Sequence, residues 1–299
     1  MVIPFFTSVL LAILLFSAEI WSQESRISFD ASGSIDWVSE ELKIQTSYNL
    51  AQAGIKLPAG RFMAEETLNE AYPRLIRPYL LTIRIDSNST IGALVEEGAI
   101  SLEDLDRVCM EADMVPPSLS ADLTRMNGRY TVHLGKLSNF LAMRRQTLEA
   151  PKPLIPARTA DYTGIIIVAS EELPIRGRRA STLTEPCLFP RIWDSNMNLV
   201  YDRNMFQSQN CLMIRYTEPE HIFRPTPSGL DGDLAALAGA NPLRILAREV
   251  YGIYPTDPVI DREDALKILS SENNRRLLRE GRVILVLNSA QLEKNISAQ

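Results

Sequence analysis

The sequence predicts an α+β protein made of two small mixed regions of strands packed on helices, joined by a proline-rich linker. Three observations lead to this prediction. Apolar and polar side chains alternate along residues 34–45, apolar side chains recur at helical spacing along residues 64–75, and residues 149–159 contain three prolines. Strands and helices then follow one another without a strict strand–helix–strand rhythm, which favours α+β over a doubly wound parallel sheet.

The N-terminus has the composition of an export signal. Residues 1–22 are largely apolar, with a core at 9–16, but polar side chains interrupt the run on both sides of this core. A membrane-spanning helix needs about 20 apolar residues, so a signal peptide is the better interpretation. We expect cleavage after Ser22 and a periplasmic location. Cleavage after Ala18 is the competing site, and an uncleaved anchor is the other alternative, since no Lys or Arg precedes the core.

The remaining chain is long enough for two modest domains. We expect an N-terminal α+β domain at residues 23–148, a linker at 149–160, a C-terminal α+β domain at 161–288 and a polar tail at 289–299. The net charge is −6 and there is no long Lys/Arg cluster, which argues against nucleic acid as a partner.

Element by element, the N-terminal domain begins with two short strands at 34–38 and 41–45. Their inward side chains are predicted to be Ile35, Trp37, Leu42 and Ile44. A helix follows, because Ala64, Leu68, Ala71 and Leu75 lie on one helical face. Pro73 and Pro78 fall inside this pattern and each lacks a backbone donor, so a kink or break is expected there.

The rest of this domain is predicted to be mostly helical. Ser101 and Asp104 have the spacing of a capping box at the start of one helix. The expected elements are helices at 91–98, 101–113 and 118–126, then a strand at 129–134.

The C-terminal domain begins with a near-continuous apolar run at 162–169, typical of a strand buried on both faces. Pro242 suits the first turn of a helix, so 243–251 is predicted to be helical. The other expected elements are strands at 188–194, 199–202, 211–216, 259–260 and 282–287, and a helix at 261–272.

No compact catalytic motif occurs in the chain. P-loop, GxGxxG, HExxH and GxSxG patterns are absent, and His133 and His221 are the only histidines. His133 alternates with apolar neighbours, so we expect it on the outer face of its strand. The prediction is a non-enzyme with no catalytic, cofactor-binding or metal-binding residues.

Three cysteines are present, at positions 109, 187 and 211. An oxidising compartment permits one disulfide, and Cys187 with Cys211 is the favoured pair because both lie on neighbouring strand-like runs. The alternative is that all three, Cys109 included, are buried free thiols that pack as small apolar side chains.

Several stretches taken together resemble a known pattern. They comprise residues 33–37, a helix from Arg61 to the turn at 85–87, and the segments 163–169, 189–194, 199–201, 241–247, 259–265 and 278–287. This order resembles bacterial envelope proteins related to the flagellar accessory proteins FlgP and FlgT and to the small LPP-type surface lipoproteins. The resemblance implies a non-catalytic protein of the cell envelope, with an accessory role at the flagellar basal body. Many such proteins carry a lipobox cysteine, which this chain lacks, so no lipid anchor is expected.

Two functions from different classes follow. The first is an exported structural or assembly protein that contacts envelope or flagellar motor proteins, or copies of itself. The alternative is a periplasmic binding module for a small ligand or cell-wall component. A hydrolase that uses His133 or His221 is a third and weaker hypothesis.

Overall fold

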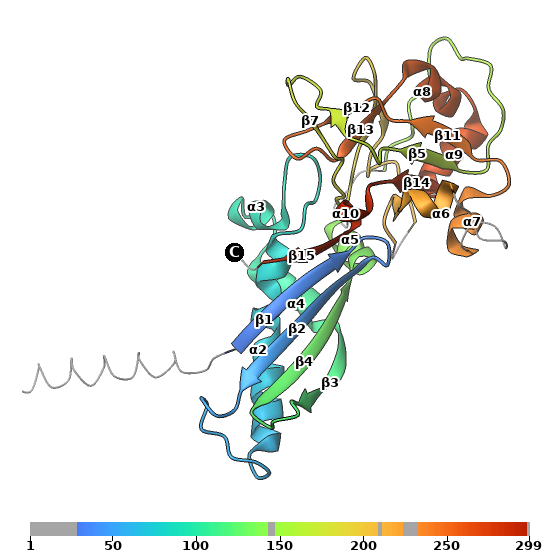
Figure 1. Cartoon of the computed structure of the whole chain (residues 1–299). Coiled ribbons are helices and arrows are strands. Elements are labelled where there is room, and N and C mark those ends of the chain that lie inside the picture. Colours follow the sequence, from blue (N-terminus) through green and yellow to red (C-terminus); the bar gives the residue numbers. More distant parts are fainter. Residues whose placement is uncertain (1–28, 143–146, 209–210, 224–231, 298–299) are drawn as a thin grey trace, which may run out of the picture.

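The computed structural model describes residues 29–142, 147–208, 211–223 and 232–297. The predicted leader and its cleavage sites lie outside these residues. The fold is α+β, and two regions lie end to end (Figure 1). One apolar core cluster runs from the N-terminal region into the C-terminal region. Within the described residues, no helix combines the length and apolar character needed to cross a membrane.

The N-terminal region is a five-stranded antiparallel sheet with a long helix packed along one face (Figure 1). The order of strands in the sheet is β15-β1-β2-β4-β3. The elements are β1 (Phe29–Asp36), β2 (Glu41–Asn49), α2 (Arg61–Leu81), α3 (Ile91–Glu96), α4 (Leu102–Met110), β3 (Asp113–Leu119), β4 (Arg125–His133) and α5 (Leu134–Ala142).

Alternation places one face of this sheet against α2. On β2, Leu42 and Ile44 are fully buried while the intervening Lys43 is exposed. Across the layer, the ring of Tyr72 on α2 stacks on Tyr130 of β4 with centroids 5.1 Å apart. The strands predicted at 34–38 and 41–45 are therefore confirmed as β1 and β2, although β1 ends at Asp36.

Helix α2 is not interrupted by its prolines, so of the predicted kink or break, the break is wrong. It runs continuously through Pro73 and Pro78. Each internal proline costs about 3 kcal/mol or more. The helix offsets this cost by burying six side chains against the sheet, namely Ala64, Leu68, Tyr72, Ile76, Tyr79 and Leu80.

The predicted helix at 118–126 is also wrong, because this segment is the turn and flanking strands of the β3–β4 hairpin. Asp122 accepts hydrogen bonds from the Ser120 hydroxyl and from the Thr124 hydroxyl and backbone N–H. Such local bonds offer the backbone an alternative to the helix. Leu123 completes the turn with a positive φ of 58°.

The C-terminal region contains a parallel sheet of order β10-β14-β5-β11, a second sheet of order β12-β13-β8-β9, and the pair β6-β7. Its strands are β5 (Ile165–Val168), β6 (Leu173–Pro174), β7 (Ser181–Thr182), β8 (Ile192–Asp194), β9 (Leu199–Tyr201), β10 (Arg215–Thr217), β11 (Leu243–Leu246), β12 (Glu249–Tyr251), β13 (Asp257–Ile260) and β14 (Val283–Val286). Its helices are α6 (Pro219–Phe223), α7 (Gly232–Ala238), α8 (Arg262–Leu269), α9 (Glu272–Arg279) and α10 (Ser289–Leu292).

The buried strand expected within 162–169 is β5, and the one within 282–287 is β14. The helix predicted at 243–251 is wrong, because this stretch forms β11 and β12. Leu243 and Ile245 are buried while Arg244 and Leu246 are exposed, which is the period of a strand. The alternation decides the outcome over the helix signal that Pro242 suggested.

The segment predicted as a polar tail, residues 289–299, contains helix α10 and a strand. Residues Glu293–Ile296 form strand β15, which pairs antiparallel with β1 at the edge of the N-terminal sheet. The Trp37 backbone N–H also donates to the carbonyl of Leu292, at 2.9 Å. The last described residues of the chain therefore belong to the sheet of the first domain, and this return tethers the two regions together.

Candidate functional site at the domain junction

The two domains meet around a short segment between α2 and α3, residues 83–90, here called the docking loop. Asp86 gives the loop its shape, since its Oδ1 accepts backbone N–H bonds from Asn88 (2.9 Å) and Ser89 (3.0 Å). The apolar side chains of Ile83 and Ile85, which precede the turn, are buried, and so is Ser87 within it. In the sequence, this loop corresponds to the turn at 85–87 that ends the predicted helix.

The backbone of the docking loop is hydrogen-bonded to the C-terminal domain. Three N–H groups of that domain donate to its carbonyls, from Leu188 to Arg84 (3.0 Å), from Phe189 to Ile85 (2.7 Å) and from Tyr254 to Ser87 (2.9 Å). Gly252 permits a close approach between the two backbones. Its φ is +120°, and a Cβ at this position would lie 2.4 Å from the Ser87 Cβ.

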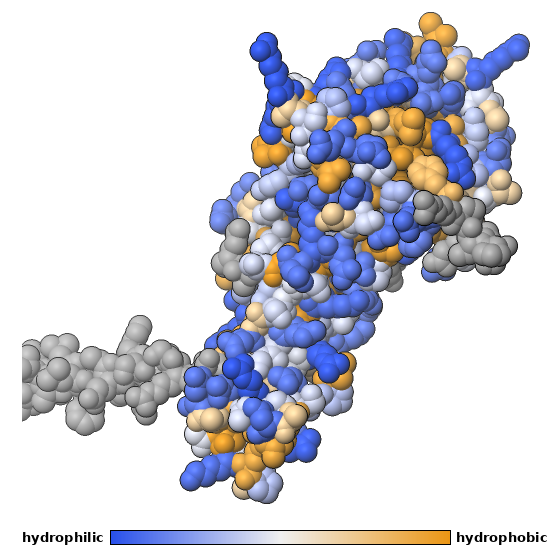
Figure 2. All heavy atoms as spheres, viewed as in Figure 1, coloured by the Kyte–Doolittle hydropathy of each residue, from blue (hydrophilic) through white to orange (hydrophobic). Residues whose placement is uncertain are grey.

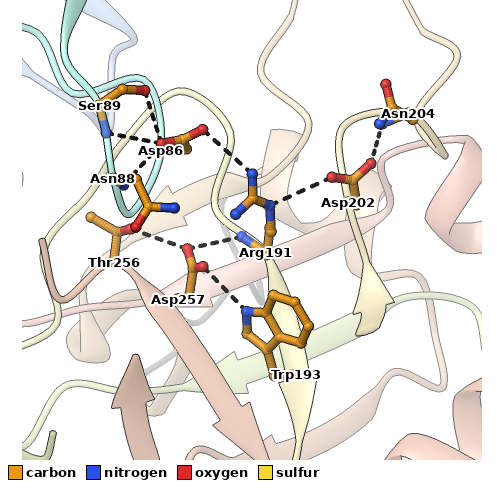
Figure 3. A network of polar contacts seen from close by, with 9 residues as sticks. All are labelled: Asp86, Asn88, Ser89, Arg191, Trp193, Asp202, Asn204, Thr256 and Asp257. Atoms are coloured by element: carbon orange, nitrogen blue, oxygen red, sulfur yellow. Dashed lines mark hydrogen bonds and ion pairs between the residues drawn. The ribbon is translucent and has the colours of Figure 1, made fainter. Parts of the chain in front are cut away.

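Arg191 joins carboxylates from both domains (Figure 3). Its Nη2 lies 3.5 Å from Asp86 Oδ2 and its Nε lies 3.6 Å from Asp202 Oδ2. The backbone N–H of Arg191 donates to Asp257 Oδ1 at 3.1 Å, and the Trp193 indole donates to the other oxygen of Asp257 at 3.2 Å. Asp257 is fully buried, and burial raises the pKa of its carboxyl despite these donors.

A second set of contacts lies near the start of β2 and β10. Trp37 meets the ring of Tyr216 edge-on, with centroids 5.6 Å apart. The Arg215 Nε lies 3.2 Å from Glu40 Oε1. Burial raises the pKa of Glu40, and the nearby Arg215 only partly offsets this effect. The junction thus combines aromatic packing with half-buried ion pairs.

A third ion pair links the docking loop to the segment before β8. Arg84 Nη1 lies 2.5 Å from Glu185 Oε2, and the Arg84 guanidinium lies over the ring of Tyr254 at 5.1 Å from its centroid. Lys294 of β15 reaches the same carboxylate at 3.8 Å. The Glu185 carboxylate therefore forms ion pairs with Arg84 of the docking loop and Lys294 of β15.

A cavity of about 670 Å³ opens beside the docking loop. Helices α3, α4 and α5 and the end of β4 form most of its wall, and Arg203 of the C-terminal domain also lines it. Its apolar lining consists of Ile85, Leu94, Ala99, Ile100, Val108, Val132, Phe140 and Leu141. Its charged lining consists of Asp86, Asp104, Arg107, Glu111, His133, Lys136 and Arg203.

His133 lies at the wall of this cavity, half-buried, and has an acidic partner that the sequence did not reveal. Its Nε2 lies 2.8 Å from Asp113 Oδ2. Asp113 is on β3 and opposes Thr131 of β4, so strand pairing brings together residues that are distant in sequence. Lys136 approaches the same carboxylate at 4.0 Å. His133 and Lys136 hold the pKa of Asp113 below its usual range.

The other histidine, His221, belongs to α6 of the C-terminal domain. Its Nδ1 lies 3.2 Å from the Thr217 hydroxyl. Among the described residues, no group of three or more His, Cys, Asp or Glu side chains is placed to hold a metal ion.

The three cysteines are free thiols in the structure, so the Cys187–Cys211 disulfide is not formed in it. Cys187 is buried where the Tyr216 hydroxyl donates to its carbonyl and accepts from its N–H. Burial raises the pKa of Cys187 strongly and raises that of Cys109 to about 12. Cys211 is half-buried, and its pKa is raised by burial and by the charge of Glu40.

Fold and junction together define a two-domain α+β protein whose domains share one core and an ion-paired interface. Comparison with protein families gives these domains a more particular assignment. Residues 28–140 match the N-terminal domain of Treponema pallidum Tp0624, and residues 164–289 match the second domain of the same protein. The chain is thus similar to Tp0624 in both domains and in their order, over about four fifths of its length. No curated protein matches the chain.

Proposed function

We propose that this protein is an exported, non-catalytic structural or assembly component of the bacterial envelope, which acts through protein–protein contacts. The observation that carries the proposal is the extensive set of contacts that joins the two domains. Relative motion is the ordinary expectation for two domains unless their interface is large and apolar. Here a shared core, the docking loop and strand β15 all oppose such motion.

A junction with many contacts between the domains favours a structural role over ligand binding by domain closure. Proteins that close around a ligand by domain motion use a few hinge residues between the domains. In this chain the docking loop is hydrogen-bonded across the junction and Arg191 links Asp86 to Asp202. A rigid body of this kind presents the surfaces of both domains at a fixed spacing, which suits a component of a larger assembly.

Export is tested by fractionation of cells that carry the whole gene or a version without codons 2–22. The proposal expects the intact chain in the periplasmic fraction, with a mature N-terminus at Gln23, and the shortened chain in the cytoplasm. Recovery of the intact chain in the cytoplasm would refute export.

The assembly role is tested by cross-linking in intact cells, with Arg191→Met as the variant that loosens the junction and Arg248→Met as a matched control. Arg248 pairs with Asp261 at an exposed site within the C-terminal domain. We expect the native chain and the control to give the same cross-linked partners, and the loosened variant to lose them. Equal partners for all three chains would contradict a role for the rigid junction.

The flagellar motor is the assembly that the sequence resemblance suggests first. Deletion of the gene followed by cryo-tomography of the motor tests this version. A motor of unchanged shape in cells of normal motility would exclude it and leave the wider envelope role intact.

A second candidate function is the binding of a small amphipathic ligand, which the cavity beside the docking loop favours. Its volume falls in the range of about 300–1,000 Å³ that is usual for ligand sites, and it combines an apolar lining with a few charged groups. Thermal-shift screening with envelope lipids and cell-wall fragments tests this candidate, because a ligand of the folded state raises stability with its concentration. Ala99→Trp, at an exposed position on the cavity wall, is expected to abolish any such shift.

A further inference from the structure

The proline-rich segment predicted as a linker is a strap fixed to the C-terminal domain at both ends. Near its start, the Leu148 backbone N–H donates to the carbonyl of Asn204 at 2.8 Å, and Ala150 is buried. Near its end, the Ala157 N–H donates to the Ser270 hydroxyl at 2.9 Å. Residues 148–157 therefore form a loop whose ends are held and whose middle projects from the domain (Figure 1).

The apex of this strap exposes two aliphatic side chains. Leu154 is 102% exposed and Ile155 is 84% exposed, the highest values among the large apolar side chains that are exposed in the described part of the chain. Figure 2 shows apolar atoms at the extreme end of the C-terminal domain, where Figure 1 draws this loop in yellow-green. Pro153 and Pro156 flank the pair and restrict its backbone, so little conformational freedom is lost when the apex is immobilised.

The charges closest to the apex in sequence are positive. Lys152 and Arg158 are both exposed, one on each side of the aliphatic pair. The strap runs beside α9, which carries three arginines and one glutamate. The acidic residues of this region lie away from the apex: Glu149 is near the start of the strap, Asp161 follows its end and accepts a bond from Ser271, and Glu272 and Glu280 pair with the arginines of α9. The two charged side chains that flank the aliphatic pair are therefore both cations, in a chain whose net charge is −6.

We propose that this apex inserts into the interface of an anionic lipid bilayer and holds the protein at a membrane surface. Binding of a peripheral anchor increases with the apolar area that enters the interface and with attraction between cations and anionic lipid. A convex apex with aliphatic side chains at its tip and cations at its base has this arrangement.

The prolines also favour lipid over a protein partner that adds a strand. An unpaired backbone N–H is costly in an apolar medium. Pro151, Pro153 and Pro156 have no N–H, which reduces the number of donors that must leave water. The same absence leaves few donors for pairing with a strand of another protein.

The inference rests on the proposed envelope function for its cellular setting and adds a lipid partner to the protein contacts. It is tested with purified full-length chain and vesicles whose acyl chains are brominated, which quench only an indole that enters the bilayer. Ile155→Trp reports on the apex, and Phe62→Trp is the matched control, because Phe62 is 73% exposed on α2 of the other domain. Both variants carry Trp21→Phe, so that the leader contributes no signal, and unfolding curves check that both fold.

The expected result is several-fold stronger quenching for Ile155→Trp than for Phe62→Trp on anionic vesicles, and weak quenching of both on zwitterionic vesicles. Adding Lys152→Gln and Arg158→Gln should raise the lipid concentration for half-maximal quenching by about 30-fold, since each cation near an anionic surface contributes about 1 kcal/mol. Equal quenching at the two positions would overturn the proposal, even if the chain binds vesicles through its leader. A cross-link from position 155 to a protein without quenching would overturn it in favour of a protein pocket. Neither outcome affects the fractionation test of export.

Discussion

The substitution Gly252→Ala should weaken the contact between the two domains, because its methyl group would overlap with the docking loop. Gly252 lies in the turn after β12, with a φ of +120°, and it faces the docking loop. A Cβ built here would lie 2.4 Å from the Ser87 Cβ and 2.5 Å from the Tyr254 carbonyl oxygen. The partner atoms belong to a Cβ and to backbone, so a side-chain rotation cannot relieve the overlap.

The magnitude follows from two separate costs. A residue other than glycine held at such a φ loses on the order of 1–3 kcal/mol. Overpacking of a site that cannot relax costs about a further 1–3 kcal/mol. Gly177→Ala separates these costs, because Gly177 also has a positive φ, +81°, but has no atom within 4 Å of its Cβ position. We expect a loss of about 1 kcal/mol for Gly177→Ala and about 3 kcal/mol for Gly252→Ala.

Equilibrium urea unfolding measures both variants, with tryptophan fluorescence as the probe of the junction and circular dichroism as the probe of the whole chain. If the added methyl opens the junction, the two probes of Gly252→Ala should no longer give coincident transitions, because the domains then unfold separately. Gly177→Ala should retain the relation between the probes seen in the native chain. Equal losses of stability for the two variants would refute the inference that the contact between Gly252 and Ser87 holds the domains together.

Three further results are expected. Arg191→Met should lower the free energy of unfolding by about 2 kcal/mol in urea titrations, because the carboxylates of Asp86 and Asp202 lose their cation. The control Arg248→Met should lower it much less. Similar losses for the two variants would contradict a special role for Arg191. Burial raises the folded-state pKa of Glu40, so the folded chain binds this proton more tightly than the unfolded chain does. The carboxyl therefore lowers the stability of the folded state as pH rises from its ordinary pKa through the raised value. The native chain should therefore lose stability relative to Glu40→Gln as pH increases from about 4 to 7, and a constant difference would exclude this effect. Finally, a thiol reagent should modify the half-buried Cys211 of the native protein well before Cys187, and mass spectrometry of timed samples checks the order.

Much of the fold could be predicted because local pattern and tertiary environment agree. The alternation at Leu42 and Ile44 predicts a strand with one buried face, and β2 has this form. The apolar run at 162–169 predicts a strand buried on both faces, and β5 is one of the two inner strands of a four-stranded parallel sheet. The capping box at Ser101 and Asp104 starts α4 as its spacing predicts.

The incorrect predictions arise where a local signal competes with distant packing. Pro73 and Pro78 indicate a helix break, yet burial along the whole of α2 outweighs the missing donors. Pro242 indicates the start of a helix, but the following residues pair with β5 as strand β11. In each case the deciding interactions are with residues far away in the chain, which no local window contains.

The candidate site was the least predictable part. Its cavity and ion pairs consist of groups from separate segments, such as His133 with Asp113 and Asp86 with Arg191. Each of these residues looks like an ordinary surface or turn residue in sequence. The sequence also does not distinguish a free cysteine from one in a disulfide, since the distance and orientation of the two cysteines decide whether they can pair.

The sequence by itself determined the α+β class, the two regions and most of the elements within them, because periodicity and capping act over a few residues. The tertiary structure alone decided that β15 returns to the N-terminal sheet, that the docking loop joins the domains and that the proline-rich segment is a fixed strap with an exposed aliphatic apex. These features depend on which distant surfaces exclude water from one another. That choice is made by the packing of the whole chain.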